Sequence, residues 1–385
     1  MQQFEMHSKN ANGIISIEYG RKYVYSFDLE GRLLNYINEG RTYRRTLQNH
    51  LIFSRVVSGE RISEEVVEKE AKYIVDQAYD EIKNIIPSIR DNDITPFLSK
   101  IASMNWQKLQ LDAENLTRIY SGSVPIVPPD QYFALYVILE RGCKWNRCNF
   151  CELYRDRKFS TLSLKDITKQ IVDLEKFFGM GIESRRSIFI GEANAMSLPQ
   201  ELLLSATELL NNHFRLPIYS FSEPFTGHGP KTVKELQELR NHGLKRVYIG
   251  LESGSRKILR LINKPMDLNV FRDYVHRLKE SKISVGIIVI LGIGGRNLYD
   301  EHIRNTVDII KDLNLDSSDI VYLSPFVQYP GFNYTDDSEH IIPLSHEEML
   351  VQGREIRKDL LQPKSEQNND HVFPVALYNL LEAQY

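Results

Sequence analysis

The sequence is poor in cysteine, with only three in its 385 residues. An odd and small number argues against a fold held together by disulfides. Long apolar runs are also missing, since no stretch approaches the roughly 18 residues that span a bilayer. The N-terminal residues MQQFEMHSKNANG lack the charged-then-apolar pattern of a signal peptide. We therefore expect a cytoplasmic protein without a membrane partner.

An excess of charge of one sign is missing as well. The chain has 48 Lys and Arg against 51 Asp and Glu, so it has no overall positive field that would draw it onto nucleic acid. The 42% hydrophobic and 26% charged fractions are typical of globular domains with a buried core. These balances favour a small-molecule substrate and argue against a nucleic-acid partner.

The first 125 residues are predicted to form an α+β accessory domain. Residues 15–31 alternate between apolar and polar side chains, which indicates short strands. A long amphipathic helix is expected to begin at Ser63, a good N-cap, and to end before Pro87. The Ser-, Gly- and Pro-rich stretch 121–131 is typical of a linker, and we place a domain boundary near residue 126.

From residue 126 to 330, short apolar runs alternate with helical stretches, which predicts six β/α units. The expected strands are 132–140, 187–191, 217–222, 246–252, 284–292 and 319–326. The expected helices are 164–178, 200–213, 231–242, 255–263, 268–281 and 298–313. Several strands are apolar throughout, as expected of parallel strands covered on both faces. The predicted fold is a partial, TIM-like (β/α)6 barrel, with residues 331–385 as a C-terminal extension packed on it.

All three cysteines lie within nine residues, directly after the first predicted core strand. Cys143, Cys148 and Cys151 have the spacing C-x4-C-x2-C. Three thiolates can hold a 4Fe-4S cluster and leave the fourth iron open to a ligand. A zinc site is the competing interpretation, although it normally needs a fourth protein ligand or a water. Inert buried thiols are the third interpretation.

At this point the sequence resembles the radical S-adenosylmethionine (radical SAM) superfamily over about residues 130–330. Members of that family carry a three-cysteine loop after the first strand of a partial barrel, usually with the spacing C-x3-C-x2-C. This chain has one more residue between the first two cysteines. The resemblance implies a 4Fe-4S cluster held by Cys143, Cys148 and Cys151, with SAM bound to the open iron.

The resemblance also implies SAM contacts at the ends of the following strands. Phe150, before the third cysteine, would pack by the adenine. In FIGEANAMSLP, Gly191 and Glu192 would receive the amino group of SAM, because a carboxylate pairs with an ammonium where a glycine lets the backbone approach. A solvated carboxylate is the simpler alternative for Glu192. Further contacts are implied at Ser220, Glu252, Ser253, Ile288 and Gly292.

Several alternatives stay open for function. The segment YIGLESGS is similar to those of methylthiotransferases and oxygen-independent coproporphyrinogen oxidases, so an RNA- or peptide-modifying enzyme is an alternative to a small-molecule enzyme. A non-catalytic iron–sulfur or zinc protein that acts as a sensor or scaffold is another. GIGG would suit a dinucleotide-binding oxidoreductase, but it follows the fifth strand instead of the first. No catalytic residue beyond the cluster ligands is identified.

The resemblance further implies a reductant, such as flavodoxin or ferredoxin. The basic residues Arg155, Arg157 and Lys158 follow the cysteines directly. They either form a solvated turn or contact an anionic substrate or the electron donor.

Overall fold

A computed structural model describes residues 6–20, 22–57, 60–227, 229–328, 341–362, 373–377, 379–380 and 384–385. The chain divides into two compact units. The first contains residues 1–135, 169–186 and 381–385, and the second contains residues 136–168 and 187–380. Among the described residues, no helix is both long and apolar enough to cross a membrane.

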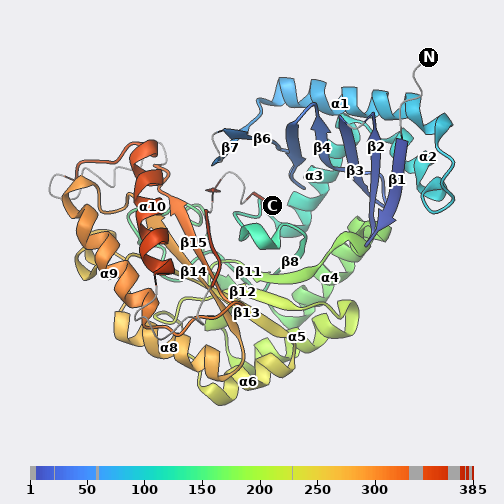
Figure 1. Cartoon of the computed structure of the whole chain (residues 1–385). Helices are drawn as coiled ribbons and strands as arrows, with labels where there is room; N and C mark the ends of the chain where they lie inside the picture. The colour runs from blue at the N-terminus through green and yellow to red at the C-terminus, as the bar shows by residue number, and fades with distance from the viewer. Residues whose placement is uncertain are drawn as a thin grey trace. The chain divides into compact units, whose positions relative to one another are not determined.

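The first unit is built on a seven-stranded antiparallel sheet, in which each strand pairs with the next one along the chain (Figure 1). Its strands are β1 (Met6–Ala11), β2 (Ile14–Tyr19), β3 (Tyr23–Asp28), β4 (Leu33–Asn38), β5 (Arg41–Arg45), β6 (Leu51–Val57) and β7 (Glu60–Glu65). Alternate side chains of β2, among them Ile15 and Ile17, are buried, whereas their neighbours are partly exposed. The alternation of the sequence therefore builds a sheet with one core face.

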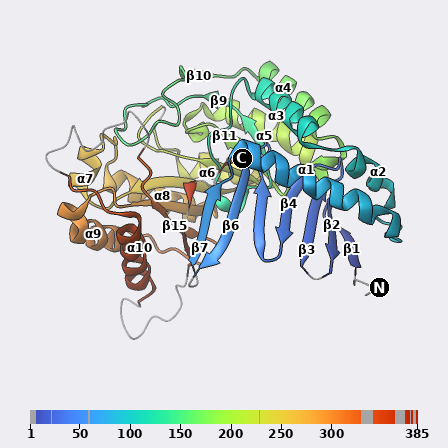
Figure 2. The ribbon, with the colours of Figure 1, turned by 90° about the horizontal axis from the view of Figure 1, so that it is seen from above.

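Three helices that follow this sheet along the chain belong to the first unit: α1 (Glu68–Ile85), α2 (Thr95–Ser103) and α3 (Trp106–Tyr120). Figure 2 shows α1 running across the strands of this sheet. Ala71, Ala78 and Ile82 of α1 are buried in one core with the sheet. The predicted apolar stripe is thus confirmed, and the helix ends before Pro87 as expected.

The predicted start of α1 at Ser63 is wrong. Ser63 lies in β7, where its hydroxyl is 2.8 Å from that of Ser54 on β6. The helix begins five residues later, after Val67, without a side-chain cap. A serine ahead of an apolar stripe is typical of a helix N-cap, but here the side chain of Ser63 forms a cross-strand pair instead of a cap.

The second unit contains a seven-stranded sheet in the order β16-β15-β14-β13-β12-β11-β8. Its strands are β8 (Ala134–Ile138), β11 (Ser187–Gly191), β12 (Ile218–Phe221), β13 (Leu244–Glu252), β14 (Ser284–Leu291), β15 (Ile320–Pro325) and β16 (Val375–Leu377). The pairs from β11 to β16 are parallel. All five residues of β8 and of β11 are buried, as expected of strands covered on both faces. The predicted α/β fold with a parallel, TIM-like sheet is confirmed.

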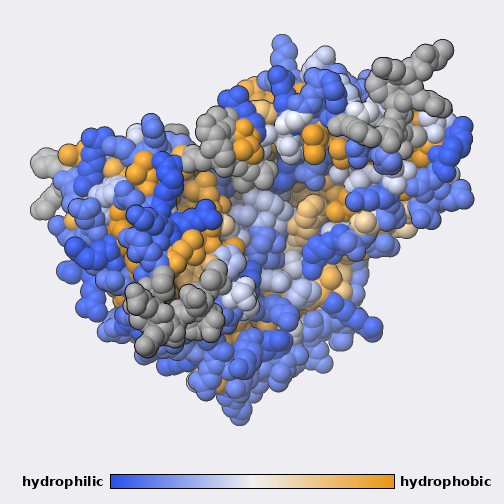
Figure 3. Space-filling view, viewed as in Figure 1, coloured by the Kyte–Doolittle hydropathy of each residue, from blue (hydrophilic) through white to orange (hydrophobic). Residues whose placement is uncertain are grey.

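Helices connect successive strands of this sheet. They are α4 (Leu164–Phe178), α5 (Gln200–Phe214), α6 (Val233–Asn241), α7 (Arg256–Leu261), α8 (Leu268–Glu280) and α9 (Tyr299–Lys311). Figure 1 shows α5, α6, α8 and α9 on the outer side of the sheet. The surface over α6 and α8 is largely hydrophilic (Figure 3), because these amphipathic helices turn their apolar stripes to the strands.

Aromatic side chains fill part of the core between the strands. The rings of Phe189, Phe221 and Tyr248 pack with centroids 5.0–6.1 Å apart. Gly286 of β14 makes room for this cluster, since a Cβ there would lie 2.3 Å from the Tyr248 ring. Close packing of large rings therefore requires a glycine in the neighbouring strand.

Past residue 330, α10 (His346–Leu361) begins with a capping box formed by Ser345 and Glu348. This helix packs against α9, β14 and β15. β16 then adds a strand beside β15. The described part of the segment 331–385 thus contributes both a helix and an edge strand to the second unit.

Candidate functional site

The three cysteines lie in the loop that follows β8 and the two-residue strand β9 (Glu140–Arg141), at the C-terminal edge of the sheet. All three are half-buried and none forms a disulfide. In parallel β/α folds this edge is where ligands bind. The loop therefore has the position that the sequence predicts for it.

Hydrogen bonds within the loop fix its shape. The backbone N–H of Asn146 donates to the Cys143 sulfur at 3.3 Å. Arg155 donates to the carbonyls of Asn146, Cys148 and Cys151 at 2.7–3.2 Å. Asn146 itself has a φ of 47°, in the left-handed region that asparagine tolerates. The turn at Asn146 accommodates the long C-x4-C spacing. Arg155 is exposed and lies in a turn, as one of the two interpretations of the basic run predicts, and its side chain also holds three carbonyls of the cysteine loop.

The segment after α7 supports the loop from outside. The backbone and side-chain nitrogens of Asn149 donate to the carbonyls of Ile262 and Leu261 at 2.9 and 3.2 Å. The indole of Trp145 donates to the Asn263 carbonyl at 2.9 Å, and the Asn263 amide donates to the Arg147 carbonyl at 2.9 Å. Four hydrogen bonds thus hold the cysteine loop to residues 261–263.

The three thiols are not arranged to share a single metal ion within the described part of the chain. Burial raises the pKa of all three, that of Cys148 to about 12. Among the described residues, no three His, Cys, Asp or Glu side chains are close enough to share one ion. Because Zn–S bonds are about 2.3 Å long, the ligands of one zinc lie within about 4.6 Å of each other. The thiolates of a cubane cluster bind different irons and stand farther apart.

Glu192 follows β11 and is almost fully buried. Its carboxylate accepts from the Gly142 backbone N–H at 2.5 Å and pairs with Arg157 at 2.6 Å. Gly191 before it has no room for a side chain, since a Cβ would lie 2.1 Å from the Tyr136 hydroxyl. The Glu192 carboxylate therefore contacts Gly142, the residue that precedes Cys143, and Arg157 compensates the buried charge of Glu192.

Glu140 is a second buried carboxylate at this edge, and only 1% of it is exposed. One oxygen accepts from the Asn194 backbone N–H at 2.6 Å, whereas the other has no hydrogen-bond partner among the residues that the structure describes. Burial raises the pKa of Glu140 to about 7, and the nearby Glu192 carboxylate adds to the increase. An unsatisfied buried oxygen is costly, so this carboxyl is poised to receive a donor or a cation.

We expect Glu140 to make the metal-free protein less stable as the pH rises. Its pKa lies near 7 in the fold against 4.5 in the unfolded chain, so the folded state binds more protons between these values. Its contribution to the free energy of unfolding should fall by about 3 kcal/mol across that window. Denaturant titrations at several pH values would measure this, with Glu140→Gln as the control that loses the effect. An equal pH dependence in both proteins would contradict it.

Glu252 ends β13 and forms a buried ion pair with Lys264 at 2.6 Å, with side-chain exposures of 9% and 10%. Burial lowers the pKa of Lys264, but the charges of Glu252 and Cys148 outweigh this and the net shift is upward. Gly250 makes room for the pair, because a Cβ there would lie 2.2 Å from the Glu252 carboxylate and 3.0 Å from the Lys264 nitrogen. The pair is close enough to Cys148 for their charges to interact.

Two further residues predicted to contact SAM, Ser253 and Ser220, form hydrogen bonds within the protein. The Ser253 hydroxyl lies 2.9 Å from His302 Nδ1 and accepts from the Ser255 N–H at 3.0 Å. Ser220 is fully buried and bonds backbone carbonyls of Ile190 and Phe221. Both hydroxyls thus have partners within the fold.

The remaining predicted residues are Phe150, Ile288 and Gly292. Phe150 is half-buried in the cysteine loop, and Ile288 is 9% exposed in β14. The Gly292 N–H donates to Gln352 of α10 at 2.8 Å, and a Cβ would meet Met349 at 2.7 Å. Gly292 therefore lies against α10, and no hydrogen bond joins it to the cysteine loop in the described part of the chain.

Sequence reasoning missed three charged residues of this site: Glu140, Arg157 as the partner of Glu192, and Lys264. In the sequence, Glu140 is only the last residue of an apolar predicted strand. A carboxylate at the C-terminal end of a buried parallel strand is itself an indication of a binding or catalytic site. Lys264 follows the motif YIGLESGS by nine residues, on the far side of a helix. Its pairing with Glu252 depends on tertiary structure, which no local pattern reports.

Comparison with known proteins supports the family assignment. Residues 137–310 match the model of the radical SAM superfamily. This range contains the cysteine loop, Glu192, the Glu252–Lys264 pair and the strands β11 to β14. The match confirms the resemblance, and with it the prediction of an enzyme family that uses a 4Fe-4S cluster and SAM.

Curated relatives share the same region at low identity. The chain is 23% identical over 208 residues to a protein of Rickettsia felis named tRNA-2-methylthio-N(6)-dimethylallyladenosine synthase, covering 52% of this chain and 42% of the relative. A protein of the same name from Treponema denticola is 22% identical over 227 residues, covering 55% and 48%. The chain spans less than half the length of these relatives.

Two solved structures have similar folds. Coproporphyrinogen III oxidase from Escherichia coli has 16% identity and a TM-score of 0.44, covering 63% of this chain and 62% of that one. SuiB from Streptococcus suis has 15% identity and a TM-score of 0.43, covering 88% and 71%.

Proposed function

We propose that this chain, which carries a radical SAM domain over residues 137–310, reductively cleaves S-adenosylmethionine and acts on a small substrate that is not yet identified. The observation that carries the proposal is the braced loop with three free, half-buried thiols at the C-terminal edge of a parallel sheet. When bound there, a reduced 4Fe-4S cluster would supply the electron that converts SAM into methionine and a hydrogen-abstracting 5′-deoxyadenosyl radical.

Cys143, Cys148 and Cys151 would hold the cluster as thiolates. Loading would release their protons, so the high thiol pKa values predict that metal uptake is favoured by higher pH. Arg155 keeps the loop carbonyls in place during this step. The Asn146 N–H, which donates to the Cys143 sulfur, stabilises a thiolate at that position.

Glu140 and Glu192 are proposed to receive the ammonium of SAM. Their charges repel each other, and this repulsion contributes to the raised pKa of Glu140. Arg157 compensates Glu192, but one Glu140 oxygen has no hydrogen-bond partner in the described part of the chain. A bound ammonium would satisfy that oxygen and relieve the repulsion, since opposite charges at close range favour the ionised carboxylate.

Lys264 and Glu252 are proposed to hold the other polar groups of SAM. Lys264 carries the positive charge near Cys148 and suits the SAM carboxylate, whereas Glu252 and Ser253 suit the ribose hydroxyls. Phe150, Ile288 and Gly292 are proposed to contact the adenine, and Ser220 to line the same edge. The buried strands around the site would exclude water from a reactive intermediate.

The test is SAM cleavage by anaerobically purified protein. After reconstitution with iron and sulfide, addition of SAM and dithionite should release 5′-deoxyadenosine and methionine, measured by chromatography. Protein without reconstitution is the control and should release neither. Absence of cleavage by protein with a full cluster, with candidate substrates present, would contradict the proposal. Such a result would instead favour a non-catalytic metal-binding sensor or scaffold.

RNA modification is the second candidate function. The two relatives described above are named as synthases of a modified tRNA nucleoside, so the balanced charge of this chain is no argument against a nucleic-acid substrate. The decisive observation would be tRNA binding that weakens steeply with salt, because phosphate contacts release counterions. A peptide substrate is a further alternative under the same cleavage chemistry.

A further inference from the structure

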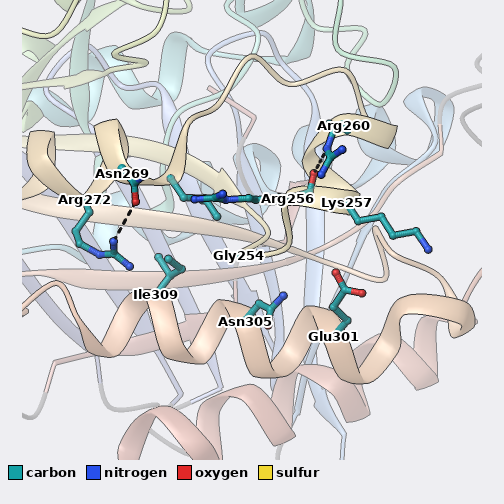
Figure 4. Close-up of a pocket in the computed structure, with 10 residues that line it drawn as sticks. Gly254, Arg256, Lys257, Arg260, Asn269, Arg272, Glu301, Asn305 and Ile309 are labelled. Carbon is teal, nitrogen blue, oxygen red and sulfur yellow. Dashed lines mark hydrogen bonds between the residues drawn. The ribbon is translucent and has the colours of Figure 1, made fainter.

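A groove of about 370 Å³ lies between α7, the start of α8 and α9 (Figure 4). Four cations line it: Arg256, Lys257 and Arg260 from α7, and Arg272 from α8. Glu301 of α9 is the one acid among the lining residues, and its carboxylate accepts from the Ser255 hydroxyl at 2.5 Å. Arg272 is paired with Asp312 at 3.5 Å, so the positive charge of the groove comes mainly from the three cations of α7, although the chain as a whole has a net charge of −3.

The cations of α7 are not neutralised within the described part of the chain. Arg256, Lys257 and Arg260 are exposed and form no ion pair there. The Arg260 side chain donates to the Arg256 carbonyl at 3.3 Å. In Figure 4, Arg256 and Lys257 extend in opposite directions along the groove. These three exposed cations outnumber the one acid that lines the groove, and such an excess of one sign produces a local potential that attracts anions.

This cationic surface adjoins the cysteine loop. A second hollow is lined by Lys257, Arg260 and Leu261. The Leu261 carbonyl accepts a hydrogen bond from Asn149, the residue directly after Cys148. Arg147 of the loop is also exposed and lies 5.5 Å from the centre of the Trp145 ring. The path from α7 to the cluster ligand Cys148 therefore runs through one hydrogen bond, from Asn149 to Leu261, and one residue, Asn149.

We propose that Arg256, Lys257 and Arg260, together with Arg147, form the docking surface for an acidic one-electron carrier protein. This inference rests on the proposed function, because it names the partner that reduces the cluster. In the step, the carrier loses one electron and the cluster gains it, and no atom is transferred. Attraction between a positive patch and an acidic partner speeds productive encounter and makes it sensitive to salt.

The position of the surface favours an electron carrier over nucleic acid. A carrier needs to approach the cluster from outside, and α7 contacts the loop through residues 261–263. A substrate that reacts with SAM must instead reach the site bounded by Glu140, Glu192 and Glu252. The cations lie on the side of the loop that faces α7, whereas the charged groups at the strand ends are mostly acidic.

The test compares two reductants. We expect Arg256→Glu/Lys257→Glu/Arg260→Glu to keep the SAM cleavage rate of the wild type with dithionite, since these exposed side chains have no part in holding SAM. With reduced flavodoxin as the donor at low salt, the rate should fall roughly 10-fold or more, because electrostatic steering contributes at least that much to association. The difference should shrink as salt is added.

The matched control is the triple variant Lys165→Glu/Lys234→Glu/Lys245→Glu, which reverses the charge of three exposed lysines outside α7. It changes the net charge equally and should retain the flavodoxin-driven rate. An unchanged flavodoxin-driven rate in the α7 variant would overturn the inference. Loss of tRNA binding in that variant, with flavodoxin-driven reduction intact, would overturn it in favour of nucleic acid.

Failure of the proposed function would be distinguishable from failure of this inference. If the wild type does not cleave SAM with dithionite, the enzymatic proposal fails, and flavodoxin binding is then measured directly by calorimetry. Binding to the wild type that the α7 variant loses and the lysine control keeps would support the docking surface. Equal binding by all three proteins, or none by the wild type, would overturn it.

Discussion

Cys148→Ala is expected to lose the 4Fe-4S cluster and, with it, all SAM cleavage. The chain has only three cysteines, so no other thiol can replace the missing ligand. Reconstituted protein should bind close to four irons per chain in the wild type and close to none in the variant. Iron and sulfide analysis, the visible absorption spectrum and release of 5′-deoxyadenosine would measure the effect.

Lys144→Ala is the matched control for this prediction. Lys144 is exposed in the same loop, between the first two cysteines, and its side chain forms no hydrogen bond among the described residues. We expect this variant to load iron as the wild type does. A normal cluster spectrum from Cys148→Ala would contradict the ligand assignment. Loss of the cluster in Lys144→Ala as well would show that the loop tolerates no substitution. The ligand assignment would then be tested by comparing the iron content of Cys143→Ala and Cys151→Ala with that of Lys144→Ala.

Lys264→Met should destabilise the fold and abolish SAM binding. The substitution leaves Glu252 buried without its partner, and removing one member of a buried ion pair typically costs about 3–5 kcal/mol in free energy of unfolding. A chemical denaturation midpoint would measure the loss of stability, and equilibrium dialysis with labelled SAM would measure binding. Lys264→Arg keeps the charge and is the control expected to retain more of both.

The double variant Glu252→Gln/Lys264→Met separates stability from binding. Removing both charges should restore much of the lost stability, because no buried charge is left unpaired. SAM binding should stay lost, since the groups proposed to hold its carboxylate and ribose are gone. If Lys264→Met unfolds at the same denaturant concentration as the wild type, the ion pair is not the stabilising contact that its burial indicates.

The parallel sheet and its helices were predictable because each element carries its own signal. Strand β11 and helix α4 begin and end at the predicted residues, since buried parallel strands are continuously apolar and the helices have a clear 3.6-residue period. The helices α2 and α3 were not predicted. The start of α1 was misplaced because Ser63 serves a strand pair, which depends on β6 folding back beside β7.

The candidate site was predictable only where its functional side chains lie close together in the sequence or in a recognisable motif. Three cysteines within nine residues indicate a metal site by themselves, and the strand-end segments placed Glu192 and Glu252 beside it. The partners of these carboxylates were not predictable. Arg157 and Lys264 reach them across 35 and 12 residues of chain, respectively. The oxygen of Glu140 that has no hydrogen-bond partner among the described residues was not predictable either, because it depends on the tertiary structure around it.

The braced loop has a consequence for repair. Iron–sulfur centres exposed to oxygen lose iron, and many metal sites then collapse because the metal was what ordered them. Here Arg155 and residues 261–263 keep the loop in shape through protein contacts alone. These protein contacts restrict the conformations of the loop and so reduce the conformational entropy that cluster loading has to remove. A molecule that has lost its iron is therefore expected to reload iron and sulfide more readily than a variant in which Arg155 is replaced by Ala.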